Sequence, residues 1–88
     1  MKLIETIQFL DLKFARTVRS TPAKNITSWE NTQSYDVTVT VNETDTTYTQ
    51  PRQLCLKTKN NTTYLYINHL SRRNLTKIPL TTIEDIGV

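Results

Sequence analysis

Basic and aromatic side chains lie close together in the second half of this sequence. Residues 46–83 hold six Lys or Arg residues and no Asp or Glu, with three tyrosines and the one histidine among them. A dense cationic surface attracts anionic partners, and aromatic rings beside it can stack on bases or pack against side chains. We expect the contacts to a macromolecular partner to come from Trp29, Arg52, Lys57, Lys59, Tyr64, Tyr66, His69, Arg72, Arg73 and Lys77.

Acidic residues are also missing from a second block, residues 13–29, which adds four cations. Ten of the eleven cations therefore lie in two acid-free blocks, and the net charge of +3 understates this segregation. Trp29 ends the second block and has few apolar neighbours in sequence. A core position is the simpler interpretation for this tryptophan, but it also fits a partner contact, since interface hot spots are rich in Trp.

Nucleophilic catalysis would have to use Cys55 and His69, the one cysteine and the one histidine of the chain. A thiolate nucleophile needs an imidazole within hydrogen-bond reach and a third group to orient that imidazole, and the spacing indicates neither. We interpret Cys55 as a small thiol in a strand and His69 as a residue at a strand end. We therefore predict no catalytic residue and no enzyme activity.

Cofactor and metal sites also lack their usual residues. Phosphate-binding loops and dinucleotide fingerprints need several glycines where the backbone approaches phosphate, and the chain has one, Gly87. A structural zinc ion takes four Cys or His ligands, and the chain has two such residues. We predict neither a cofactor nor a metal ion.

Length and composition favour one small domain over residues 1–88. A chain of 88 residues with 36% apolar residues supports a single lean core, which a partner could complete. One cysteine allows no internal disulfide, so we expect a reducing, intracellular compartment (cytoplasmic or organellar) and no secretion. Polar residues interrupt every apolar run, so we expect no membrane span.

The predicted fold class is α+β, with an N-terminal amphipathic helix packed on a small antiparallel sheet of about four strands. Apolar residues recur every three or four positions at the start of the chain, which predicts a helix over residues 2–17. A strand is the alternative, because the same segment also shows a period of two. Residues 18–34 are expected to form a loop between helix and sheet. The apolar stripe of the predicted helix is Leu3, Ile7, Leu10, Phe14 and Val18.

Strands are predicted where apolar and polar residues alternate. Residues 35–41 alternate without a break, and Asn60-Asn61 between two such runs predicts a two-residue hairpin turn. Thr82, followed by two acidic residues, is expected to cap a final helical turn. The predicted strands are 35–41, 46–50, 53–58 and 63–70, with a further short strand near 76–80.

The predicted strand 63–70 is apolar on both faces, with Leu65 and Ile67 on one face and Tyr64 and Tyr66 on the other. Such a strand is either central and covered on both sides, or its tyrosines form an open platform. An open platform would resemble, in chemistry alone, the stacking surfaces of RNA-binding sheets. The glycine-containing signature of the RNA-recognition motif is absent.

Two functions fit these features. The first is a protein-binding module, either a small accessory subunit of a larger assembly or an inhibitor such as viruses use against host enzymes, since basic patches and strand edges suit protein partners. The second is single-stranded nucleic-acid or RNA binding through tyrosine stacking and phosphate contacts. We favour an acidic protein partner, because +3 is a small net charge for a nucleic-acid binder. We also expect Asp36, Glu43 and Asp45 on the same sheet as the tyrosines. A sheet edge further offers a route to homo-oligomers.

Overall fold

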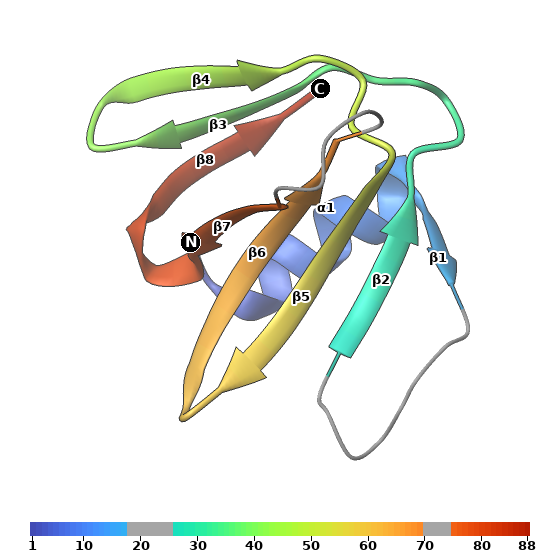
Figure 1. Ribbon diagram of the computed structural model, residues 1–88. Helices are drawn as coiled ribbons and strands as arrows, with labels where there is room; N and C mark the ends of the chain where they lie inside the picture. The colour runs from blue at the N-terminus through green and yellow to red at the C-terminus, as the bar shows by residue number, and fades with distance from the viewer. Residues whose placement is uncertain (18–25, 70–74) are drawn as a thin grey trace.

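A computed structural model describes residues 1–17, 26–69 and 75–88 of the chain. These residues form one α-helix and two antiparallel sheets (Figure 1). The α+β class, with an N-terminal helix and antiparallel strand pairing, is therefore confirmed. The prediction of one sheet of about four strands is imprecise, because the described ranges hold eight strands in two sheets.

The large sheet has five strands in the order β1-β2-β5-β6-β7, and all neighbours in it are antiparallel. The strands predicted at 53–58, 63–70 and 76–80 correspond to β5, β6 and β7, with ends that agree to within two residues. The bounds are β1 (Ala15–Thr17), β2 (Ile26–Glu30), β5 (Gln53–Lys59), β6 (Thr62–Asn68) and β7 (Leu75–Pro79).

The small sheet has three strands in the order β4-β3-β8. The predicted strands 35–41 and 46–50 correspond to β3 (Val37–Val41) and β4 (Thr44–Tyr48). The third strand, β8 (Ile83–Gly87), replaces the helical turn that was predicted after Thr82. Thr82 instead ends a short 3-10 turn, where its hydroxyl donates to the carbonyl of Pro79 at 2.7 Å.

Helix α1 spans Leu3–Lys13 and buries Thr6 and Leu10 one turn apart. It ends because Phe14 adopts an extended backbone, with φ −126° and ψ 162°. The predicted helix is therefore wrong beyond Lys13, since Phe14 is extended and Ala15–Thr17 pairs with β2. Leu3 was predicted on the core stripe but is 44% exposed. The buried positions are instead Thr6, Leu10 and Phe14, which follow one another at intervals of four residues. Val18 lies outside the described residues.

Strand β2 lies inside the range that was predicted as a loop. Each of its residues pairs with β5, from Ile26 opposite Lys57 to Glu30 opposite Gln53. This pairing gives a polar-looking segment an inner and an outer face, and Trp29 on the inner face is fully buried. Residues 18–25 of the predicted loop lie outside the described residues.

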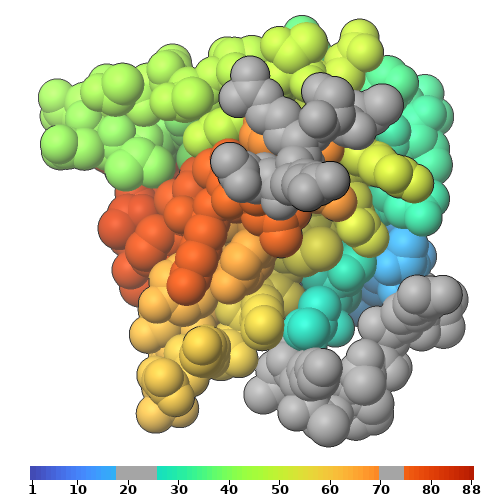
Figure 2. Space-filling model, viewed as in Figure 1, coloured from blue at the N-terminus to red at the C-terminus, as the bar shows by residue number. Residues whose placement is uncertain are grey.

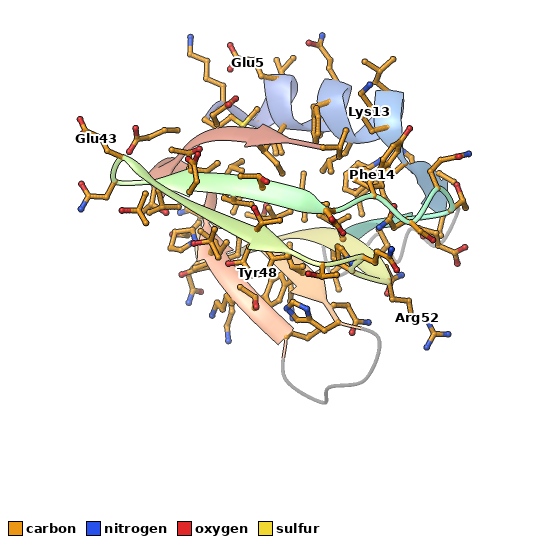
Figure 3. The ribbon with its side chains drawn as sticks, turned by 90° about the horizontal axis from the view of Figure 1, so that it is seen from above. Glu5, Lys13, Phe14, Glu43, Tyr48 and Arg52 are labelled. Atoms are coloured by element: carbon orange, nitrogen blue, oxygen red, sulfur yellow. The ribbon has the colours of Figure 1, made fainter. Side chains whose placement is uncertain are left out.

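The core lies between α1, the inner face of the large sheet and the small sheet. Figure 1 shows α1 behind the large sheet and the small sheet across one end of it, and Figure 3 gives the view from above that end. No helix in the described ranges is long and apolar enough to cross a membrane. The buried apolar side chains are Leu10, Phe14, Trp29, Val37, Val39, Leu54, Leu56, Leu65, Ile67, Leu80, Ile83 and Ile86.

Two tight turns fix the register of the hairpins. Asn60 and Asn61 have φ values of 52° and 64° and join β5 to β6, with Lys59 opposite Thr62. This confirms the predicted two-residue hairpin. The turn between β3 and β4 has the same form, with φ values of 52° at Asn42 and 61° at Glu43. Both match the left-handed turns that suit the twist of paired strands.

Candidate binding surface

The outer face of the large sheet is the face turned away from α1, and Figure 2 looks onto it. Side chains alternate along a strand, so β6 sends Leu65 and Ile67 into the core, where both are fully buried. Tyr64 and Tyr66 then belong to the outer face, where they are half-buried. The strand lies inside its sheet, between β5 and β7, and among the described elements its tyrosine side has no helix over it.

Strand pairing brings basic residues from both sides to these tyrosines. On β5, Lys57 lies opposite Tyr64, and on β7, Lys77 lies opposite Tyr66. The Lys77 ammonium reaches diagonally to Tyr64, with Nζ 4.3 Å from the ring centroid. Lys59 is exposed at the end of β5. The outer face therefore unites five of the predicted contact residues, namely Lys57, Lys59, Tyr64, Tyr66 and Lys77.

The two tyrosine rings are not presented as a flat stacking surface. Their centroids are 6.5 Å apart with the planes inclined by 62°, so the contact is edge to face. The Lys77 ammonium also occupies one side of the Tyr64 ring. A base that stacked on Tyr64 from that side would have to displace a cation–π contact, which contributes about 0.5–1 kcal/mol at exposed positions.

A small apolar pocket opens on the outer face beside the tyrosines. Its cavity volume is about 200 Å³, and its walls are Ile26, Cys55, Lys57, Tyr66 and Leu75. The side chain of Leu75 is 51% exposed, which is high for a leucine in a strand. The Cys55 sulfur lies 3.2 Å from the hydroxyl oxygen of Ser28, so a serine rather than a histidine is its polar neighbour.

Three predicted contact residues do not lie on this face. Trp29 is fully buried on the inner side, so its prediction as a partner contact is wrong. His69 follows β6 and turns to the small sheet, with its ring centroid 5.6 Å from that of Tyr48 and its Nε2 3.2 Å from the Thr76 hydroxyl. Burial raises the pKa of the Tyr48 hydroxyl. Arg52 is exposed and extends away from the body of the molecule (Figure 3).

Arg52 instead borders a second, polar cavity of about 370 Å³ at the end of β2, β5 and β6. Glu30, Asn31, Gln53 and Asn68 also line it. Hydrogen bonds hold two of the lining residues in place. The side-chain amide of Asn31 donates to the carbonyl of Pro51 at 2.8 Å, and the backbone N–H of Arg52 donates to the carbonyl of Asn68 at 2.8 Å. Arg72 and Arg73, predicted beside the tyrosines, lie outside the described residues.

Acidic residues gather on the small sheet and not with the tyrosines. Asp36, Glu43, Asp45, Glu84 and Asp85 account for five of the eight acids and belong to β3, β4, β8 or the residues next to them. The expectation that acids from 36 to 45 share the sheet with the tyrosines is therefore wrong. The reason is topological, since β3 pairs with β4 and β8 and not with β5. Figure 3 shows Glu43 and Arg52 at opposite ends of the molecule.

Two residues that line the apolar pocket, Ile26 and Leu75, were not predicted as contact residues from the sequence. Leu75 carries a usable signal, because the alternation of Leu75, Lys77 and Pro79 with Thr76 and Ile78 places it on the side of Lys77. Ile26 has no such signal, since its face depends on the pairing of β2 with β5. The pocket is thus a product of strand order more than of any local motif.

Comparison of the chain with protein-family models, with curated proteins and with solved structures finds no match. The outer face must therefore be interpreted from its own chemistry.

Proposed function

We propose that this chain is a non-enzymatic binding module that holds an acidic protein surface against the outer face of its large sheet. The observation that supports this proposal is the apolar pocket with lysines beside it, on a sheet face that no described helix covers. An antiparallel sheet with one solvated face normally turns polar residues to water. Here that face instead carries Ile26, Tyr66 and Leu75.

Charge complementarity favours an acidic partner. Lys57, Lys59 and Lys77 belong to the outer face. Glu30, the last residue of β2, is an acidic residue on the same face. Positive and negative patches that face each other speed encounter and exclude wrong partners. The apolar pocket supplies the area whose burial gives a protein complex its affinity.

Single-stranded nucleic acid is the second candidate, and the separation of the acids onto the small sheet favours it. The outer face is more basic than the net charge of +3 suggests, which suits phosphate contacts. The tilted tyrosines and the cation on Tyr64 favour it less, because stacking needs an open ring face. We therefore place a protein partner first.

Affinity capture from the native source tests the proposal. Immobilised wild-type chain is compared with Lys57→Glu/Lys77→Glu, which reverses two outer-face charges, and with Lys2→Glu/Lys13→Glu, which makes the same charge change on α1. We expect an acidic protein to be retained by the wild type and the α1 variant and lost from the outer-face variant. Retention that nuclease treatment abolishes would replace the proposal with the nucleic-acid candidate.

A further inference from the structure

We propose that the apolar pocket receives one aliphatic side chain (Leu, Ile or Met) from an acidic segment of the partner, whose carboxylates pair with Lys57 and Lys77. This inference rests on the proposed function and specifies what the outer face recognises. The polar cavity that Arg52 borders, at the end of β2, β5 and β6, has no part in this recognition.

The size of the pocket limits its occupant. Sites for small organic ligands usually enclose about 300–1,000 Å³, and this cavity has about 200 Å³. Such a space suits a single side chain of a protein segment. Its apolar walls come from Ile26, Leu75, the ring of Tyr66 and the thiol of Cys55, which offer an aliphatic group more contact than a polar one.

The position of the lysines defines what surrounds the occupant. Lys57 forms part of the pocket wall, so its methylene stem packs there while its ammonium can stay in water. Lys77 lies across Tyr66 on the neighbouring strand. Cations therefore stand on β5 and β7, on either side of β6. When an aliphatic residue of the partner enters the pocket, the residues next to it in the partner's sequence come within reach of both ammonium groups. Carboxylates at those positions would then have their charge neutralised by Lys57 and Lys77.

Planar nucleobases fit this pocket poorly. Ile26 and Leu75 are branched aliphatic side chains and offer no flat surface for stacking. Neighbouring Tyr64, the more natural place for a base, already carries the Lys77 ammonium 4.3 Å from its ring centroid. The same residues that weaken the nucleic-acid candidate thus favour an aliphatic side chain flanked by acids.

Selection from a random library of 12-residue peptides tests this inference on the full chain. We expect the enriched peptides to combine at least one Leu, Ile or Met with two or more acidic residues. The best peptide is then titrated against wild type, Leu75→Ala, Leu75→Asp and Leu12→Asp. Leu75 and Leu12 are both exposed, at 51% and 76%, so each variant should fold. Affinity should fall about threefold or more for Leu75→Ala, at least tenfold for Leu75→Asp and less than twofold for the helix control Leu12→Asp.

The peptide itself provides the decisive comparison. Replacing its aliphatic residue with Ala should weaken binding at least tenfold, and raising the salt from low to high concentration should weaken binding further because the lysine contacts are screened. If the Ala peptide binds equally well, the pocket inference fails while binding of an acidic partner stands. If selection enriches nothing, or enriches basic peptides, the inference is overturned. Capture of an acidic protein that depends on Lys57 and Lys77 would then separately show whether the proposed function survives.

Discussion

The indole Nε1 of Trp29 lies 2.9 Å from Oδ1 of Asp11 and donates a hydrogen bond that ties the large sheet to helix α1. The Arg16 guanidinium binds both oxygens of the same carboxylate, at 2.9 and 2.8 Å, and lies 5.5 Å from the Trp29 ring centroid. One acid therefore joins the helix, the edge strand β1 and the most voluminous core side chain.

Removal of this carboxylate should weaken the fold. Asp11→Ala leaves the buried indole N–H without its acceptor and Arg16 without its partner. We expect the free energy of unfolding to fall by about 1–2 kcal/mol, at the lower end for hydrogen bonds to charged groups because the Asp11 side chain is 42% exposed. Urea denaturation at neutral pH measures this loss. Asp85→Ala, which removes an exposed acid of β8, is the matched control and should change the stability by less than about 0.5 kcal/mol.

The contribution of Asp11 to stability should disappear in acid. Hydrogen bonds from Arg16 and then from Trp29 lower the pKa of Asp11 in the folded chain. A group with a depressed pKa stabilises the fold at pH values above its unfolded pKa, which is about 3.9, and this stabilisation is lost as the pH falls through the folded value. The difference in unfolding free energy between wild type and Asp11→Ala should therefore shrink between about pH 5 and pH 2. A difference that stays constant over that range would contradict this assignment.

Neighbouring residues of β5 should respond very differently to truncation. Leu54 is fully buried on the inner face, whereas Cys55 lies on the outer face. We expect Leu54→Ala to cost about 2–5 kcal/mol through the cavity it leaves and Cys55→Ala to cost less than about 1 kcal/mol. Thermal and urea unfolding of the two variants compare them directly. Equal losses would mean that β5 is covered on both faces.

The turn between β3 and β4 should tolerate a glycine better than its native residue. Glu43 has a φ of 61°, a left-handed conformation that is unfavourable for residues with a Cβ atom. Its backbone N–H donates to Glu84 Oε1 at 2.8 Å, a bond that a glycine would keep. Glu43→Gly should therefore stabilise the chain by about 0.5–1 kcal/mol. Asn61→Gly should give a smaller gain, because Asn accepts this conformation more readily. Destabilisation by Glu43→Gly would show that its side chain contributes more than the turn geometry indicates.

The sequence predicted correctly those strands in which apolar and polar residues alternate strictly, because this alternation determines which side chains face the core. Val37 and Val39 are buried two residues apart, as the pattern of residues 35–41 indicates, and Asn60-Asn61 forms the predicted turn. The last strand was hidden because its buried residues, Ile83 and Ile86, are three apart, a spacing more typical of a helix. The register shift between Thr40 and Val41 absorbs the extra residue, so both isoleucines still face the core.

The candidate surface was predicted in part for a similar reason. Alternation alone placed Tyr64 and Tyr66 on one face, and it correctly separated them from Leu65 and Ile67. Which strands lie beside them depends on long-range pairing, so neither the apolar pocket nor the place of the acids on another sheet was visible in the sequence. Trp29 had both a core and a contact interpretation, and its burial confirms the core position, because the pairing of β2 with β5 turns its side chain inward.

The separation of charge between the two sheets makes the net charge a poor guide to how this protein behaves near charged material. A net charge of +3 describes a weak cation. The small sheet nevertheless turns a group of carboxylates outward, while the large sheet presents lysines. At low ionic strength the chain should adhere to a cation exchanger through one side and to an anion exchanger through the other. Its retention on either matrix would then report molecular orientation more than isoelectric point.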